Sequence, residues 1–100
     1  MAFHVISAKK LRVFWTDHPD AEPPLRSWLR VVEQADWQNF AEVRATFAHA
    51  DTVGRCVVFN IGGNKYRLIA AIHYNRSKVF VRHVLTHAEY DKDHWKDDCS

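Results

Sequence analysis

The stretch from residue 55 to residue 90 constrains the fold of this 100-residue chain more than any other part of it. It reads RCVVFNIGGNKYRLIAAIHYNRSKVFVRHVLTHAEY, in which three apolar and β-branched runs are separated by two polar segments. Such runs are typical of β-strands. Gly62-Gly63-Asn64 is a strong hairpin signal because these residues tolerate positive φ angles, and Asn75-Arg76 is a weaker candidate for a second turn. The stretch therefore predicts three antiparallel strands joined by two tight turns.

A two-residue second turn fixes which side chains face each other across that hairpin. It places Arg67 opposite Val84 and Arg82 opposite Ile69. In this register one face of the hairpin is almost entirely apolar and suits a core, while the other face carries the cations toward solvent. Arg67 and Arg82 become diagonal neighbours, close enough to hold one phosphate group.

The register of the first hairpin depends on the length of its loop, since one extra residue turns every side chain to the other face. An even-numbered loop sends Val57, Phe59 and Ile61 to the core and Asn60 to the cationic face. An odd-numbered loop buries Asn60, which then needs hydrogen-bond partners of its own. We favour the even-numbered loop, and the alternative stays open at this point.

Apolar residues recur at helical spacing on the N-terminal side of these strands. After a short predicted strand over residues 3–6, a first helix is expected to end before His18-Pro19, because the residue before proline is pushed out of helical geometry. A second helix is predicted after Asp20, whose side chain is expected to cap it. A third, short helix is predicted after Asn39.

A capping box follows the last predicted strand, with Thr86 as N-cap and Glu89 three residues on. It predicts a short C-terminal helix that carries His87 in its first turn and Tyr90 one turn later. The expected architecture is α+β, a small antiparallel sheet packed against two or three N-terminal helices. Residues 1–100 are expected to form a single domain.

Positive charge is concentrated in the same stretch. Residues 55–88 contain six lysine or arginine residues and no acidic residue, whereas residues 1–54 contain six against seven and residues 89–100 two against five. A chain with a formal net charge of only +2 therefore gathers its cations on one sheet. Such a patch suits an anionic ligand, and its structural alternative is an ordinary solvated face.

The composition favours a cytoplasmic protein without cofactor or metal. The hydrophobic fraction of 47% is ordinary for a globular domain, and no apolar run approaches the ~20 residues of a membrane span. The N-terminal residues MAFHVISAKK do not resemble a signal peptide. Cys56 and Cys99 form no CxxC motif and no disulfide framework, so we expect reduced thiols.

Five side chains form a candidate site for cutting RNA without a metal: Lys65, Arg67, Arg82, His87 and Tyr90. In that reaction the ribose 2′-hydroxyl attacks the adjacent phosphorus. The protein then needs a base, cations on the non-bridging oxygens and an acid at the leaving 5′-oxygen. His87 is the natural proton-transfer group because imidazole titrates near neutral pH. Tyr90 is expected to stack on a nucleotide or to take part in proton transfer.

Structural alternatives apply to the aromatic residue and the histidines of this stretch. A tyrosine on an amphipathic helix, such as Tyr90, is often half-buried packing. His83 falls on the apolar face of the expected register and is predicted to be a core histidine. His83 and His87 have an HxxxH spacing, but the pair spans a strand end and a helix cap and has no thiolate or carboxylate partner nearby. A zinc site is therefore not expected.

The segments VFNIGGNKYRLIAAI and VFVRHVLTHAEYDK, followed by Trp95-Lys96, resemble the HigB family of bacterial type II toxins. The similarity continues upstream through KKLRVFW and HPDAE and covers nearly the whole chain. It implies a RelE/ParE-like fold, in which a small curved antiparallel sheet packs against N-terminal helices. It also implies an mRNA interferase, an endoribonuclease that cuts messages, typically those being translated on the ribosome.

The same resemblance assigns roles to individual residues. The basic positions of the family's active-site sheet are matched by Lys65, Arg67 and Arg82, and its C-terminal histidine and tyrosine by His87 and Tyr90. The candidate RNA-binding residues beside them are Asn60, Lys78 and Lys92.

The implied partner is a HigA-type antitoxin with a helix-turn-helix DNA-binding domain, and we expect the two proteins to form a heterotetramer. Two alternative functions stay open. One is a ParE-type toxin, which has the same fold but inhibits DNA gyrase without cutting RNA. The other is a simple RNA-binding module without catalytic activity.

Overall fold

The computed structural model describes residues 2–99, along which strands and helices are interspersed. The strands are β1 (His4–Ile6), β2 (Asp51–Val53), β3 (Cys56–Ile61), β4 (Tyr66–His73) and β5 (Lys78–Thr86). The α-helices are α1 (Lys9–Asp17), α2 (Glu22–Gln34), α3 (Phe40–Thr46) and α4 (His87–Asp91). The 3₁₀ helices are η1 (Pro19–Ala21), η2 (Tyr74–Arg76) and η3 (His94–Cys99).

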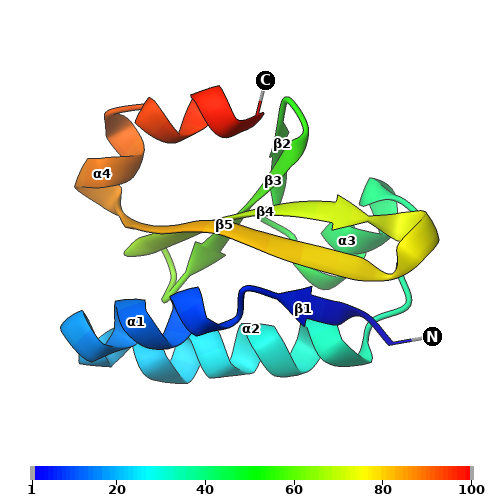
Figure 1. Ribbon diagram of the computed structural model, residues 1–100, viewed down its shortest axis with the longest axis horizontal. Coiled ribbons are helices and arrows are strands. Elements are labelled where there is room, and N and C mark those ends of the chain that lie inside the picture. The colour runs from blue at the N-terminus through cyan, green and yellow to red at the C-terminus, as the bar shows by residue number, and fades with distance from the viewer. Residues whose placement is uncertain (1, 100) are drawn as a thin grey trace.

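The five strands form one open sheet in the order β1-β5-β4-β3-β2 (Figure 1). Neighbouring strands pair antiparallel, except that β1 pairs in parallel with the start of β5. The α+β prediction is therefore confirmed. The sheet is one strand wider than the sequence indicates, because residues 51–53, predicted as a connector, form the edge strand β2.

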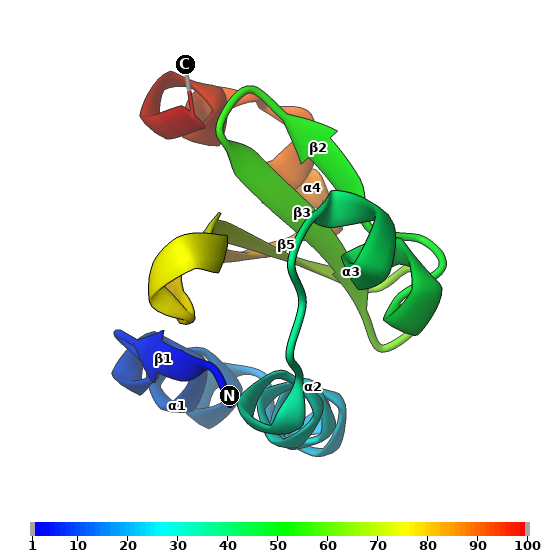
Figure 2. The ribbon, with the colours of Figure 1, turned by 90° about the vertical axis from the view of Figure 1, so that its right-hand side faces the viewer.

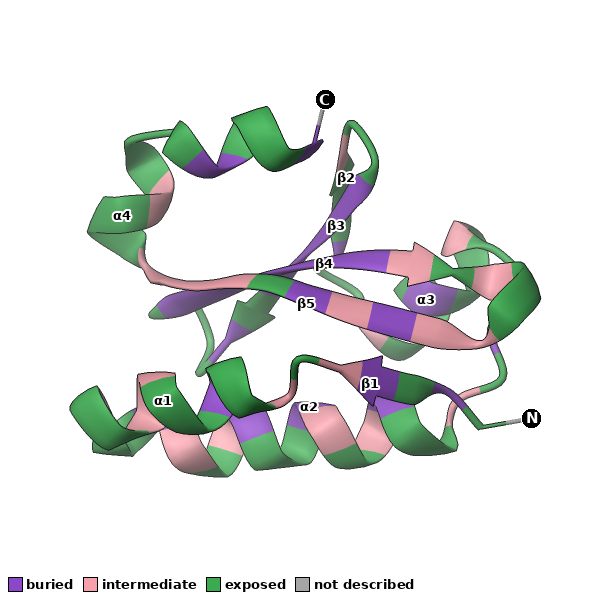
Figure 3. Ribbon diagram, viewed as in Figure 1, coloured by how far each residue is buried: buried purple, intermediate pink, exposed green. Residues whose placement is uncertain are grey.

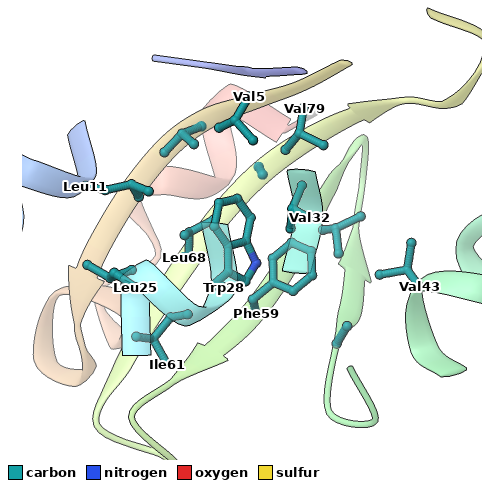
Figure 4. Close-up of a cluster of buried hydrophobic side chains, with 14 of the residues drawn as sticks. Val5, Leu11, Leu25, Trp28, Val32, Val43, Phe59, Ile61, Leu68 and Val79 are labelled. Carbon is teal, nitrogen blue, oxygen red and sulfur yellow. The ribbon is translucent and has the colours of Figure 1, made fainter. Parts of the chain in front are cut away.

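The sheet carries a layer on each face (Figure 2). α1 and α2 lie side by side under one face, and the segment from α4 to η3 lies over the other. Large apolar residues fill the space between the sheet and the N-terminal helices (Figure 4), among them Leu11, Leu25, Trp28, Val32, Phe59, Leu68 and Val79. None of the helices within residues 2–99 is long and apolar enough to cross a membrane.

The first hairpin has the predicted even-numbered loop. Ile61 pairs with Tyr66 across a four-residue loop, residues 62–65, in which Gly62 and Gly63 have φ angles of +62° and +69°. Glycine is required there because other residues are strained at positive φ. Ile61 accordingly faces the core, as do Val57 and Phe59, while Asn60 is exposed opposite Arg67.

The second hairpin follows the predicted register only next to its turn. The predicted pairing holds as far as Ala70 and Val81, and a β-bulge at Arg82 then shifts it, so that Arg67 pairs with Leu85, one residue later than predicted. A bulge turns the following side chains of its strand to the opposite face. The predicted diagonal pair of Arg67 and Arg82 is therefore wrong.

The same bulge changes the surroundings of the residues that follow it. Val84 packs against the main core, whereas Leu85 packs on the opposite face of the sheet. The prediction of a core histidine at position 83 is wrong, because His83 is half-buried and its Nε2 lies 2.5 Å from Oδ2 of Asp98.

The second face of the sheet is covered where the sequence predicts a solvated face. Cys56, Val58 and Ile69 pack against Trp95 and Cys99 of η3. β4 is consequently buried along most of its length (Figure 3). A disulfide joins Cys56 to Cys99, so the prediction of free thiols is wrong. The two cysteines are 43 positions apart, and only the folded chain brings them together.

Candidate functional site

Arg67 lies where β4 meets α4, and its side chain is buried, with a fractional exposure of 8%. Burial of a charged side chain is unusual unless its polar atoms have partners. The guanidinium donates to the carbonyl of Tyr66 at 3.1 Å and to Oδ1 of Asn64 at 2.5 Å. Its Cζ lies 5.2 Å from the ring centroid of Tyr90, within reach of a cation–π interaction. These contacts hold the guanidinium in one position.

Tyr90 connects Arg67 to the C-terminal segment. Its ring stacks on Trp95, with the centroids 5.0 Å apart and the planes 13° from parallel. Its carbonyl accepts a hydrogen bond from Nε1 of Trp95 at 2.9 Å. The tyrosine is half-buried, as the structural alternative for this residue predicts. The same ring also lies against Arg67.

His87 lies in the first turn of α4, and the predicted capping box is present. Oγ1 of Thr86 accepts from the amide of Glu89 at 3.2 Å, and Oε1 of Glu89 accepts from the amide of Thr86 at 2.9 Å. Nδ1 of His87 lies 3.0 Å from Oδ2 of Asp91, and the imidazole is about half exposed. This contact orients the ring and leaves Nε2 for a ligand.

Arg82 lies apart from Arg67, in a groove of about 650 Å³ between α1 and β5. Lys9, Lys10 and Phe14 of α1 line this groove, which we call the α1–β5 groove. Nζ of Lys10 donates to the carbonyl of Arg82 at 2.9 Å and so fixes α1 to the bulged part of β5. The side chain of Arg82 is exposed. Glu89 of α4 also lines the groove, so the groove extends to α4.

Lys65 is held by an acidic residue of the N-terminal layer. Its ammonium pairs with the carboxylate of Asp20, which also accepts from the hydroxyl of Tyr66 at 2.5 Å. The hydrogen bond from Lys65, and after it the bond from Tyr66, lowers the pKa of Asp20. The same hydrogen bonds to Asp20 raise the pKa of Lys65 and the pKa of Tyr66. The prediction that Asp20 caps the second helix is wrong, because Asp20 lies within η1 and Ala21 is the N-cap of α2.

The three candidate RNA-binding residues are spread over the fold. Asn60 faces Arg67 across the first hairpin, and Lys92 follows α4 at the edge of a small cavity of about 290 Å³ that Trp95 also lines. Lys78 begins β5, at the end of the strand remote from α4. At ~3.3 Å per strand residue, that separation is roughly 25 Å. Asn60 and Lys92 thus lie toward the α4 end of the sheet, and Lys78 lies at the opposite end.

The match to known proteins covers most of the chain. Residues 21–93 fit the model of the HigB toxins, described as the RelE-like toxic component of a toxin-antitoxin system. The chain belongs to the HigB family. It is 33% identical over 92 residues to the mRNA interferase HigB of Escherichia coli O6:H1, which is 89% of each chain. It is 28% identical over 91 residues to the mRNA interferase toxin HigB of Escherichia coli K12 and to the mRNA interferase HigB of Shigella flexneri, in each case 88% of both chains.

Three residues not predicted as site residues hold the candidate site of this HigB toxin together. Asn64 and Trp95 support Arg67 and Tyr90, and Asp20 fixes Lys65. The turn signal at Asn64 indicates its place in the hairpin loop, but no spacing in the sequence links Asp20 or Trp95 to the sheet. No group of three or more His, Cys, Asp or Glu side chains among residues 2–99 has an arrangement that could hold a metal ion.

Proposed function

We propose that this HigB toxin is an mRNA interferase that cuts RNA through attack of a ribose 2′-hydroxyl on the neighbouring phosphate. The observation that carries the proposal is the contact of Arg67 with Tyr90, one turn of α4 away from His87. One short helix and the strand beside it thereby offer a cation, a phenol and an imidazole in one place. The curated relatives that bear the name mRNA interferase support the same activity.

The proposed reaction forms a bond from the 2′-oxygen to phosphorus and breaks the bond to the 5′-oxygen. One fragment then ends in a 2′,3′-cyclic phosphate and the other begins with a 5′-hydroxyl. A base takes the proton of the 2′-hydroxyl, and an acid returns a proton to the leaving oxygen. His87 is oriented by Asp91 and exchanges a proton through Nε2, and Tyr90 positions the nucleotide or supplies the second proton transfer.

Arg67 binds the phosphate whose bonds change. Its contacts with Tyr66 and Asn64 use two of the five N–H donors of a guanidinium, which leaves three for the non-bridging oxygens. A donor that meets the charge as it develops contributes on the order of 10²–10³ in rate.

Arg82 binds a neighbouring phosphate from the α1–β5 groove. It precedes Leu85, the partner of Arg67, by three positions on β5, or roughly 10 Å at ~3.3 Å per residue. Lys65 shares its charge with Asp20 and therefore contributes more to the shape of the hairpin than to phosphate binding.

As a component of a toxin-antitoxin system, the toxin is proposed to bind a HigA-type antitoxin with a helix-turn-helix domain, in a heterotetramer in the cytoplasm. The substrate is mRNA on a translating ribosome. Asn60 and Lys92 extend the RNA contact at the α4 end of the sheet, and Lys78 makes a separate contact at the far end of β5.

The proposal is tested in a cell-free translation system by primer extension on the messages. The wild-type toxin is expected to produce new mRNA ends, and His87→Ala and Arg82→Ala are expected to remove them. Arg76→Ala, in the turn between β4 and β5, is the matched control and should cut like the wild type. Intact messages, together with DNA-damage signalling in cells that express the toxin, would point to gyrase inhibition. Salt-dependent RNA binding without cleavage would point to a binding module.

A further inference from the structure

α4 cannot hold its two candidate site residues in place without help from the rest of the fold. It is five residues long, His87–Asp91, and an isolated helix shorter than about 12 residues is marginal in water even for favourable sequences. The capping box fixes its first turn to the end of β5, but the last turn, which carries Tyr90, needs a partner of its own.

Trp95 is that partner. It is 3% exposed, its ring stacks on Tyr90, and its indole N–H donates to the Tyr90 carbonyl at 2.9 Å. Tyr90 in turn lies against the guanidinium of Arg67. A contiguous series of contacts therefore leads from the tryptophan to the candidate phosphate-binding arginine.

The segment that carries Trp95 is fastened to the sheet at its end. Cys99 is joined to Cys56 of β3, and its carbonyl accepts from the amide of Arg55 at 2.7 Å. Gly54 allows this approach, because a Cβ at that position would lie 2.0 Å from the Cys99 carbonyl oxygen. Another contact on the same segment is that of Asp98 with His83.

We propose that Trp95 is a positioning residue for the RNA-cutting site and that the Cys56–Cys99 disulfide makes its action redox-dependent. This inference rests on the proposed function. In the disulfide form, η3 holds Trp95 on Tyr90 and so keeps the phenol against Arg67. In the dithiol form, η3 loses its covalent attachment, Trp95 leaves Tyr90 more often, and the last turn of α4 frays.

The chemical step is a thiol–disulfide exchange with a small dithiol or a dithiol protein. A thiolate of the reductant attacks one sulfur of the disulfide, and the second thiol of the reductant resolves the mixed disulfide. Two electrons and two protons pass to Cys56 and Cys99, and the reductant leaves as its own disulfide. Exchange with a protein disulfide, or oxidation by another two-electron oxidant, restores the Cys56–Cys99 disulfide.

The test compares the full-length protein before and after treatment with dithiothreitol, with two measurements on each sample. The first is amide hydrogen exchange over residues 86–93. It should become about tenfold faster on reduction, in Cys99→Ser and in Trp95→Ala, while exchange over α2 stays unchanged. The second is RNA cleavage, in which kcat should fall by about tenfold to a hundredfold with little change in KM.

Three controls separate positioning from general loss of structure. Asp98→Ala removes another contact of η3 but keeps the disulfide and Trp95, so it should match the wild type in both measurements. Trp95→Phe keeps a stacking ring and should retain most of the kcat that Trp95→Ala loses. Cys99→Ser should show no further response to dithiothreitol.

Equal exchange over residues 86–93 in the disulfide and dithiol forms would overturn the inference, as would faster RNA cleavage after reduction. If the disulfide form cuts no RNA at all, the proposed function fails. The exchange measurement then decides separately whether the disulfide and Trp95 hold α4.

Discussion

Arg67 and Arg82 are the same residue type in different surroundings, and their proposed roles differ for that reason. The alternation of the strands predicts two equivalent arginines on one face, but Arg67 is buried under Tyr90 and Arg82 is exposed in the α1–β5 groove. The residue types of the candidate site follow from charge and from the capping box. Their mutual positions do not, because they depend on a bulge and on a C-terminal segment that no local pattern signals.

Substitution of the two arginines should therefore have different effects on stability. Arg82→Ala should abolish toxicity while changing the free energy of unfolding by no more than about 0.5 kcal/mol, as is usual for an exposed side chain. Arg67→Ala should remove toxicity and also destabilise the fold by roughly 1–3 kcal/mol, because it removes a buried side chain together with its contacts to Tyr66, Asn64 and Tyr90. Urea denaturation of both variants beside a growth assay checks this. Equal destabilisation by the two substitutions would contradict the assignment of their surroundings.

The triad of Asp20, Lys65 and Tyr66 should make stability depend on pH at both ends of the range. The pKa of Asp20 is lowered by its hydrogen bonds, so its contribution is present above the usual value of roughly 3.9 and is lost as the pH falls through the lower folded pKa. The pKa values of Lys65 and Tyr66 are raised, so their contribution is present below roughly 10 and is lost as the pH rises further.

Asp20→Asn should accordingly be less stable than the wild type near neutral pH, with the difference shrinking below about pH 4. Denaturation curves of the two proteins across this range measure the difference. Glu33→Gln, on the exposed side of α2, is a matched loss of one carboxylate and should show a much smaller difference. A stability difference between Asp20→Asn and the wild type that stays constant down to pH 2 would count against the ion pair.

At the level of elements, the sequence predicts what local chemistry determines. Three predicted features are present: the helix of residues 22–34, the glycine hairpin and the capping box at Thr86. Each depends on residues that lie close together in the sequence. β2 and the bulge at Arg82 are absent from the prediction. A three-residue edge strand and a one-residue insertion are specified by the neighbouring strands, not by their own residues.

β4 should be the element most sensitive to truncation of a side chain, because layers cover both of its faces. Leu68 is fully buried between the sheet and α2, so Leu68→Ala should cost roughly 2–5 kcal/mol of unfolding free energy. Val13→Ala, at a position 57% exposed on α1, should change it by less than about 0.5 kcal/mol. Chemical denaturation measures both variants, and a small effect at Leu68 would show that β4 is not the centre of the core.

At the level of the whole molecule, the Cys56–Cys99 disulfide is the feature that no pattern in the sequence predicts. It closes a loop of 43 residues around the sheet and should stabilise the fold by up to about 4 kcal/mol through the restriction of the unfolded chain. Dithiothreitol should lower the urea midpoint of the wild type and leave that of Cys56→Ser/Cys99→Ser unchanged. Equal midpoints of the reduced and oxidised wild type would show that the bond adds nothing to stability.

The membership in the HigB family rests on a match over most of the chain, and the names of the matched relatives support the proposed activity. The most direct test of that activity is the chemistry of the RNA ends that the purified disulfide form leaves on a translated message. Attack by a 2′-hydroxyl predicts upstream fragments that end in a 2′,3′-cyclic phosphate and downstream fragments that begin with a 5′-hydroxyl, both absent with His87→Ala. Uncut messages, or fragments that carry a 3′-hydroxyl and a 5′-phosphate, would contradict the account.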